Sequence, residues 1–378
     1  MAFVNLIKFL DKRIGAIVCL ILSLFNPKAK KIAQISDGKK VLLVQLWGLG
    51  ETILCLPAIK ELRHRYKGIT IDVLTTKRVN EVFYDNRSIN SIKIISLNPL
   101  SIKLFILKNL GKYDLAIDME EYLNISAIIS FCVAKERIGY SHGIRSKLYT
   151  EKIFYNDRQH AAQAFMDLLR PLGIYSKASR LKRLGYPMDD TKKVDSLLKS
   201  NNIGKKEFIV GFGFGAAESV RERMWPAERF AELADYLIKK LKTKVILVGN
   251  KEEMALGDKI KKLSRSKDSI YNFAGQTNIR EMFYLISLCR LFVGNDAGPM
   301  HVAAAQNVKT IGLFGCNLPV RFGPLGKKNA AIRKQKGKPC INVHKGEVGM
   351  CRYGFKNACV KKIQVKDITK IMDKLNNF

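Results

Sequence analysis

The sequence predicts an α/β protein with two domains, each built on a parallel sheet. Short apolar runs alternate with segments of helical spacing along most of the chain, which is typical of repeated strand–helix units. Glycine-rich or acidic turns follow several of these runs, as they do at the carboxyl ends of strands in open α/β sheets. The length of 378 residues exceeds the ~250–300 residues at which a single core stops growing, so we expect two domains.

The composition is globular and strongly basic. The chain is 47% hydrophobic and 26% charged, and 66 Lys and Arg against 33 Asp and Glu give a net charge of +33. Such a surplus favours an anionic partner: nucleic acid, an anionic membrane face or a phosphorylated substrate. The sequence has no recognised nucleic-acid motif and no basic stripe interleaved with aromatic residues, so we expect no nucleic-acid partner.

Residues 1–39 form an N-terminal extension. An almost wholly apolar run at 14–25 is shorter than the ~20 residues that span a bilayer, and no small-residue cleavage pattern follows it. We expect an amphipathic, membrane-associating helix on an anionic leaflet, assisted by Lys28, Lys30 and Lys31. The alternative for residues 1–30 is a helix packed on the protein's own core.

The first expected domain covers residues 40–190. A continuous apolar run at 41–46 predicts a buried parallel strand, and a glycine-flanked turn with Glu51 leads from it into a helix at 53–63. The turn lies at the carboxyl end of the strand, where open α/β sheets bind ligands. Glu51 is either a general base at that edge or an acidic first-turn residue favoured by the helix dipole.

The remainder of this domain continues the alternation and ends in a Lys-rich linker. Asp118 is a second carboxylate at a strand end, and Arg137 begins a short strand that leads into a basic loop. Both are candidates for contacts with an anionic acceptor, although an exposed loop is the simpler reading of 142–147. We expect strands at 69–74, 92–95, 115–117 and 137–140, helices at 125–134 and 159–172, and the linker at 176–206.

The second expected domain, residues 191–378, repeats the pattern. The ends of three strands, at Gly213, Gly249 and Asp296, should converge at one edge of a sheet, with Arg223 near the mouth of the resulting crevice. This arrangement predicts a nucleoside diphosphate site. The expected strands are 208–211, 245–248, 269–273, 291–293 and 310–314, and the expected helices are 228–241, 279–289 and 301–306.

The chain is organised around the strand–turn–helix–strand unit at 291–314. Pro299 suits the first turn of a helix, Gly298 lets the backbone approach a ligand, and the unpaired N–H groups there favour a phosphate. His301 should lie in the same turn, close to Asp296. The alternative is a tight connection in which Asp296 caps the helix and His301 is a satisfied surface group.

Eight irregularly spaced cysteines do not form a disulfide scaffold, which indicates a reducing compartment. Cys340, Cys351 and Cys359, with His344, are either a zinc-ligand set or unpaired thiols. Because the Cys-x-x-Cys spacing of zinc knuckles is absent, we expect no metal site.

Taken together, these motifs resemble glycosyltransferase family 9, the bacterial ADP-heptose:lipopolysaccharide heptosyltransferases and their relatives. The resemblance covers roughly residue 40 to the C-terminus, in the family's order. Its most specific part is GNDAGPMH at 294–301, followed by AAA at 303–305, LFG at 313–315 and RFGP at 321–324. Supporting parts are GE at 50–51 with LPA at 56–58, YDLAID at 113–118, RMWP at 223–226 and a Cys-rich tail.

The resemblance implies a GT-B fold, in which two Rossmann-like domains face a central cleft and bind the acceptor and the nucleotide-sugar respectively. It implies an inverting, metal-independent transfer of a sugar to a lipopolysaccharide-core or related glycolipid. Heptose from ADP-heptose is the first choice for the sugar. No cofactor is expected beyond this co-substrate, and the enzyme would work on the cytoplasmic face of the inner membrane. The alternatives are another nucleoside diphosphate sugar, or a binding protein without catalysis.

The resemblance also assigns roles to residues. Glu51 matches an acidic general base that is usually Asp, and Arg223 matches a donor-phosphate contact that is commonly Lys. A Glu of the 249–253 loop often contacts the donor's nucleoside, and Glu252 and Glu253 both fit. Gln45 departs from the Lys or Arg of many relatives. The remaining donor-loop matches are Asp296, Ala297, Gly298 and His301.

Overall fold

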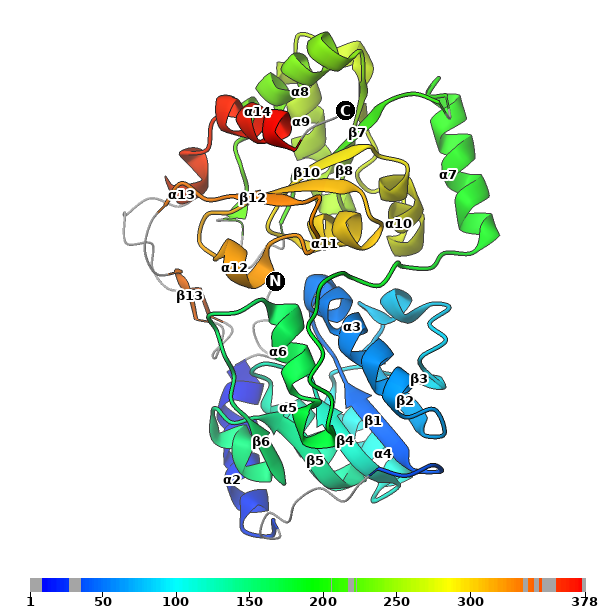
Figure 1. Ribbon diagram of the computed structural model, residues 1–378, viewed down its shortest axis with the longest axis vertical. Coiled ribbons are helices and arrows are strands. Elements are labelled where there is room, and N and C mark those ends of the chain that lie inside the picture. The colour runs from blue at the N-terminus through cyan, green and yellow to red at the C-terminus, as the bar shows by residue number, and fades with distance from the viewer. Residues whose placement is uncertain are drawn as a thin grey trace. The chain divides into compact units, whose positions relative to one another are not determined.

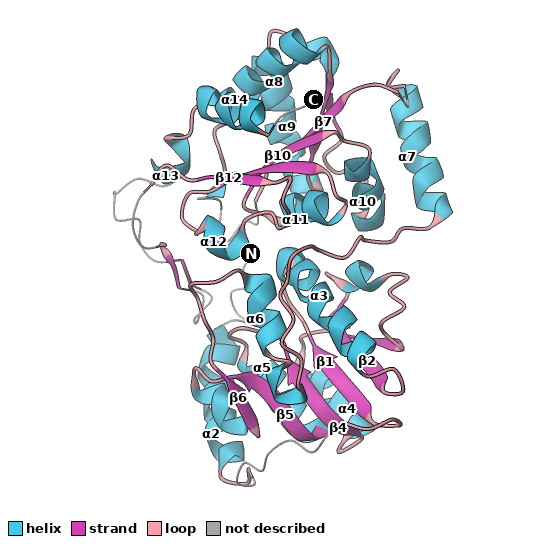
Figure 2. Cartoon of the chain, viewed as in Figure 1, coloured by secondary structure: helices cyan, strands magenta, loops and turns pink. Residues whose placement is uncertain are grey.

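The computed structural model describes residues 9–26, 35–204, 206–216, 221, 223–335, 339–342, 347–348 and 358–375. It divides into two compact units, one of Met1–Ala178 with Asn342–Glu347 and one of Ser179–Ile341 with Val348–Phe378. Each unit contains a six-stranded sheet, and every strand pair in both sheets is parallel (Figure 2). The expected α/β class with two parallel sheets is therefore confirmed.

The first sheet has the strand order β3-β2-β1-β4-β5-β6. Four of the five residues of its central strand β1 are buried, because helices cover both faces of a parallel sheet. β1 pairs with β4 in a register that sets Val44 beside Asp118, so the carboxyl ends of these two strands are neighbours. The strands are β1 (Lys40–Val44), β2 (Thr70–Thr76), β3 (Ser91–Ile95), β4 (Tyr113–Asp118), β5 (Ala134–Tyr140) and β6 (Glu151–Ile153).

Two layers of helices enclose this sheet (Figure 1). The helix after β1 packs against α6 in front of the sheet in this view, whereas α5 lies behind it and contacts both α2 and α4. The helices are α2 (Ala16–Ser23), α3 (Leu49–Arg65), α4 (Pro99–Asn109), α5 (Asn124–Val133) and α6 (Ala161–Asp167), with π-helical η1 (Asp11–Gly15) and 3-10 turns η2 (Asn80–Phe83), η3 (Ile144–Leu148) and η4 (Arg170–Leu172).

The described part of the N-terminal extension is a helix that packs on unit 1. The carboxylate of Asp11 accepts from the backbone N–H groups of Asn124 and Ile125 at 2.9 and 2.7 Å, and so caps α5 from outside that helix. Cys19 is fully buried in a cluster with Tyr149. No described helix is long and apolar enough to cross a bilayer. The alternative expectation, a helix packed on the protein's own core, is therefore confirmed for one face of this helix. Lys28, Lys30 and Lys31 lie outside the described residues.

The second sheet has the order β12-β11-β10-β7-β8-β9, and its four inner strands are buried throughout or nearly so. Its core includes Phe212, Phe230 and Trp225, whose rings are in contact. The strands are β7 (Ile209–Gly213), β8 (Lys244–Val248), β9 (Ile270–Asn272), β10 (Leu291–Asn295), β11 (Lys309–Leu313) and β12 (Ala330–Ile332); β13 (Ile341–Asn342) and β14 (Glu347–Val348) form a separate pair.

The expected linker at 176–206 is wrong in its second half, which contains α7. Val194 and Leu198, four residues apart, are buried, and α7 packs on α10. The expected boundary after residue 190 lies within this helix, and the contacts divide the chain earlier, after Ala178. The helices of unit 2 are α7 (Met188–Ser200), α8 (Ala227–Leu241), α9 (Met254–Leu263), α10 (Ile279–Ser287), α11 (Gly298–Ala305), α12 (Pro319–Phe322), α13 (Ala358–Lys361) and α14 (Val365–Lys374), with 3-10 turns η6 (Lys251–Glu253) and η7 (Lys267–Ser269).

Candidate functional site

Glu51 lies in the first turn of α3, directly after the carboxyl end of β1. Gly48, which precedes the helix, has φ +80°, a conformation that favours glycine. A Cβ at Gly48 would clash with Oε2 of Glu51, so the carboxylate lies over the glycine. The turn thus holds an acid at the carboxyl edge of the sheet, where the sequence predicts it, and its role as a base stays a prediction.

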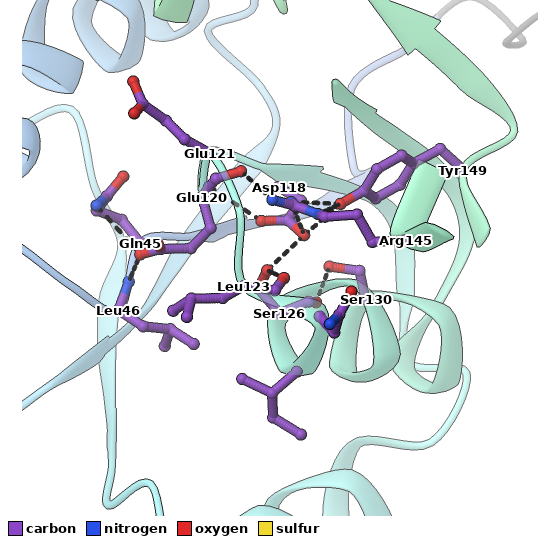
Figure 3. A network of polar contacts seen from close by, with 12 residues as sticks. Gln45, Leu46, Asp118, Glu120, Glu121, Leu123, Ser126, Ser130, Arg145 and Tyr149 are labelled. Atoms are coloured by element: carbon purple, nitrogen blue, oxygen red, sulfur yellow. Dashed lines mark hydrogen bonds and ion pairs between the residues drawn. The ribbon is translucent and has the colours of Figure 1, made fainter. Parts of the chain in front are cut away.

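A second acid, Glu120, holds this turn in place (Figure 3). Its Oε1 accepts from the backbone N–H groups of Leu46 at 2.6 Å and Trp47 at 2.8 Å, and from Nε2 of Gln45 at 3.2 Å. Burial raises the pKa of Glu120 to about 8, against the opposing effect of the two backbone N–H groups. Sequence reasoning missed this role. The sequence shows that Glu120 lies two residues after the end of a strand, but the tertiary structure sets that strand beside β1.

Asp118, the other strand-end acid of unit 1, is fully buried in an ion pair. Its Oδ2 accepts from Nη2 of Arg145 at 2.8 Å, from the Tyr149 hydroxyl at 2.7 Å and from the Ser126 hydroxyl at 2.8 Å (Figure 3). Nη1 of Arg145 also donates to the backbone oxygen of Glu120 at 2.6 Å. The expected exposed loop at 142–147 is therefore wrong at Arg145, since Asp118 draws this guanidinium into the core.

Arg137 is also buried, and each of its guanidinium nitrogens donates within the protein. Nε donates to the backbone of Leu148, Nη1 to Ala134 and Lys135, and Nη2 to Oδ1 of Asn26 at 2.6 Å. Arg137 thereby fastens the end of the N-terminal helix to β5. An acceptor role for Asp118 or Arg137 would require these contacts to open.

In unit 2, the strands that end at Gly213, Gly249 and Asp296 are neighbours in the sheet, so their carboxyl ends share one edge. Gly213 has a packing reason to be glycine, because a Cβ there would come within 2.9 Å of the Phe292 ring. The predicted convergence of three strand ends is thus present. The donor-binding role of these glycines stays a prediction.

Arg223 and Asp296 are in contact at this edge. Nη1 of Arg223 lies 3.0 Å from the backbone oxygen of Asp296 and 3.4 Å from its Oδ2. Nδ2 of Asn317 donates to the same Oδ2 at 3.0 Å. Asp296 is 3% exposed, whereas the Arg223 side chain is 21% exposed. The buried carboxylate therefore orients a guanidinium that remains partly accessible.

Asn295 builds the backbone around this pair. Its Oδ1 accepts from the backbone N–H of Trp225 at 3.0 Å, and its Nδ2 donates to the backbone oxygen of Phe214 at 2.6 Å. The indole N–H of Trp225 in turn donates to the backbone oxygen of Ile363. These bonds connect the segment after β7 with the end of β10. Sequence reasoning had not singled out Asn295 or Asn317, and the side-chain amides that fix loops give little signal in one sequence.

The helix α11 begins directly after Asp296, with Ala297 at its N-cap and no side-chain cap on its first turn. Asp296 therefore does not cap the helix, because its carboxylate faces Arg223 and Asn317, and His301 is buried rather than on the surface. The alternative reading of this turn is wrong on both points. An uncapped helix start beside a guanidinium is suited to a phosphate group.

The two candidate nucleoside contacts differ. Glu253 forms a capping box with Asn250, whose backbone N–H donates to Oε2 of Glu253 at 2.8 Å. A Cβ at Gly215 would clash with the Glu253 carboxylate, and burial raises the pKa of Glu253. Glu252 is exposed. Of the two carboxylates, that of Glu253 is therefore engaged in shaping the loop.

The cysteine group is only partly described, because Cys351 and His344 lie outside the described residues. Cys340 donates its backbone N–H to the backbone oxygen of Cys316, and Cys359 is buried. Within the described ranges, no three His, Cys, Asp or Glu side chains are grouped to hold a metal ion. The described cysteines are free thiols.

Comparison with known proteins identifies the family of this chain. The family model of glycosyltransferase family 9 (heptosyltransferase) matches residues 106–348. The chain is 26% identical over 320 residues to lipooligosaccharide heptosyltransferase 2 of Haemophilus influenzae, covering 81% of this chain and 92% of that protein.

Two solved structures share the fold. The glycosyl transferase family 9 structure from Veillonella parvula has a TM-score of 0.79 at 22% identity, over 91% of this chain and 98% of that one. The structure of Escherichia coli ADP-heptose lps heptosyltransferase II has a TM-score of 0.69 at 20% identity, over 89% and 98%. Since the family model covers well over half of its length, this chain belongs to glycosyltransferase family 9, the heptosyltransferase family, and is a glycosyltransferase.

Proposed function

We propose that this enzyme transfers heptose from ADP-heptose to a lipopolysaccharide-core or related anionic glycolipid, with inversion at the anomeric carbon and without a metal ion. The observation that carries the proposal is the contact of Arg223 with Asp296 at the uncapped start of α11. The relatives support the choice of sugar and acceptor, because one is named a lipooligosaccharide heptosyltransferase and another an ADP-heptose lps heptosyltransferase.

The donor side of the reaction needs positive charge. As the bond between the sugar and the diphosphate breaks, negative charge builds on the leaving ADP. The Arg223 guanidinium can donate two parallel hydrogen bonds to phosphate oxygens, and the first N–H groups of α11 add fixed donors. Because Asp296 and Asn317 already orient Arg223, little reorganisation is needed when the donor binds.

The acceptor side needs a base. We assign this role to Glu51, which takes the proton from the acceptor hydroxyl as its oxygen attacks the anomeric carbon. Attack from the face opposite the leaving ADP forms the new glycosidic bond, breaks the sugar–phosphate bond and inverts the configuration. Its carboxylate lies in the first turn of α3, where the helix dipole favours negative charge.

The acceptor's anchor completes the proposal. A glycolipid acceptor is reached at a membrane surface, so we place the enzyme in peripheral contact with the cytoplasmic face of the inner membrane. The basic surplus of +33 supports an anionic acceptor and an anionic surface alike.

Calorimetric titration tests the donor assignment. Wild-type protein in EDTA is titrated with ADP-heptose, UDP-glucose and GDP-mannose, and we expect binding of the ADP sugar alone. Arg223→Ala should lose that binding, whereas Arg229→Ala, which removes a half-buried arginine paired with Glu232, should keep it. Preference for another nucleotide would assign another donor, and binding that vanishes only in EDTA would overturn metal independence.

Turnover tests the catalytic assignment. With ADP-heptose and a core glycolipid, Glu51→Gln should bind donor normally but lose about 10²–10⁴-fold in kcat. The anomeric coupling of the product reports inversion. Unchanged turnover in Glu51→Gln would remove the base assignment, and donor binding without any transfer would favour a binding protein.

A further inference from the structure

Two helices on the same side of the first sheet turn apolar side chains outward. Along η1, α2 and the residues that directly flank them, apolar residues spaced three or four positions apart are exposed, and leucines in and just after α4 recur at the same spacing. The exposed residues of the first stripe are Phe9, Leu10, Ile14, Ile17, Leu20, Ile21, Leu24 and Phe25, and those of the second are Leu100, Leu104, Leu107 and Leu110. We call these residues the outer face of unit 1. Exposed apolar residues gathered in this way mark an interaction surface.

The two stripes lie in one helical layer. α5 contacts both α2 and α4, and Ile125 of α5 packs against the clusters beneath each of them. Figure 1 shows the three helices on the same side of the sheet, with α5 between the other two.

The orientation of the N-terminal helix is fixed. Asp11 holds one end to α5, Asn26 holds the other end to Arg137 and Lys147, and Cys19 is buried beneath the middle. The exposed stripe is therefore the face that remains after the helix has packed on unit 1. Ile17 is 60% exposed and Leu24 is 80% exposed.

The exposed charges of the two helical segments themselves are of one sign. Among residues 9–26 the only acid is Asp11, whose carboxylate is used as the cap of α5, and residues 94–113 contain no acid. The basic side chains in these segments are exposed; they are Lys12 and Arg13 beside the first stripe and Lys103, Lys108 and Lys112 beside the second. An apolar face with a basic rim complements an anionic lipid surface.

We propose that the outer face of unit 1 docks on an anionic phospholipid bilayer, with α2 and α4 lying in the interface. The proposal deepens the proposed function, and rests on it, by naming the surface that meets the membrane. A second copy of the chain fits less well, because a symmetric contact through this face would bring the two basic rims together. A bilayer supplies both an apolar interior and phosphate headgroups.

Vesicle co-sedimentation without donor or acceptor tests this surface. Wild-type protein should bind vesicles of phosphatidylcholine with about 30% phosphatidylglycerol, as a peripheral contact requires. We expect Ile21→Glu with Leu104→Glu to bind at least tenfold more weakly. Met188→Glu, which changes an even more exposed apolar residue of unit 2, should bind as the wild type does. Equal binding by the Ile21→Glu, Leu104→Glu variant would overturn the proposal.

A charge series separates lipid from protein partners. Each substitution among Lys103→Gln, Lys108→Gln and Lys112→Gln should weaken binding about fivefold, because one lysine near an anionic surface contributes ~1 kcal/mol. Equal binding to pure phosphatidylcholine would contradict the charge argument. Analytical ultracentrifugation tests for a second copy. If the wild type is a dimer and the double variant Ile21→Glu, Leu104→Glu is a monomer, the face would be assigned to a second copy instead.

A transfer assay keeps this proposal distinct from the proposed function. With a water-soluble core-sugar acceptor, the variants of the outer face should retain wild-type kcat, because the face carries no group assigned to chemistry. Loss of vesicle binding with intact transfer supports the docking surface. If the wild type binds vesicles but transfers no heptose, the proposed function is refuted and the docking surface is not. Unchanged melting temperatures would show that the variants are folded.

Discussion

Nη2 of Arg145 lies 2.8 Å from Oδ2 of Asp118, and both side chains are excluded from solvent. The pair connects the turn after β5 with the carboxyl end of β4. Hydrogen bonds from Ser126 and Tyr149 to the same carboxylate satisfy it further. Such a pair is costly to break, because the remaining partner keeps a buried charge without compensation.

Arg145→Ala should therefore lower the free energy of unfolding by about 3–5 kcal/mol. Urea denaturation followed by circular dichroism measures this loss. Arg158→Ala, at an exposed arginine of the same unit, should stay within about 0.5 kcal/mol of the wild type. If Arg145→Ala does not fold, Tyr149→Phe provides a milder test with an expected loss of about 1–2 kcal/mol. Wild-type stability in both variants would contradict the structural role of the pair.

Gly48→Ala should displace the proposed base. A Cβ at this position clashes with Oε2 of Glu51, so we expect at least a tenfold drop in kcat with unchanged donor affinity. Gly38→Ala is the matched control, because Gly38 has a similar φ of +81° and no atom within 4 Å of its added Cβ. Steady-state kinetics of both variants separates displacement of Glu51 from backbone strain. Equal kcat values in the two variants would refute the link between Gly48 and the base.

Asn317→Asp should weaken donor binding. The new carboxylate would lie beside Asp296 in place of a donor and would compete for Arg223. Because a like charge in a buried site is unfavourable, we expect the Kd of ADP-heptose to rise about tenfold. Isothermal titration measures this rise. Tighter or unchanged binding would show that the orientation of Arg223 does not depend on Asn317.

Glu120 predicts a dependence of stability on pH. Burial raises its pKa to about 8 from an ordinary 4.5, so the folded protein holds this proton more tightly than the unfolded chain does. Its contribution is therefore complete below pH 4.5 and is lost as the pH rises through 8, by at most about 1.4 kcal/mol per pH unit.

Glu120→Gln should remove this component, because the amide does not titrate. Denaturation curves at pH 5, 6.5 and 8 should show that the wild type loses stability relative to Glu120→Gln as the pH rises. Glu252→Gln, at an exposed glutamate, should follow the wild type. Parallel curves for the wild type and Glu120→Gln would show that Glu120 is ionised throughout this range.

The sequence predicted most of the fold because its signals are local. Buried strands of a parallel sheet are apolar without interruption, and glycines and acids at their ends mark the ligand-binding edge. The runs at 41–46, 245–248 and 291–293 therefore predicted β1, β8 and β10 closely. α7 was missed because Lys and Asp dominate its composition, although its few apolar residues bury one face.

The sequence by itself determined the two-sheet architecture, the strand ends with Glu51 and Asp296, and the basic surplus. Only the tertiary structure decided which charged groups are buried and what they contact. Arg145 and Arg137 look like exposed basic residues in the sequence, yet partners 27 and 111 positions away bring them into the core. The N-terminal helix is another example, because the bonds of Asp11 to the start of α5 decide which of its faces is buried. Such contacts depend on distances between residues remote in the chain, and no local pattern encodes them.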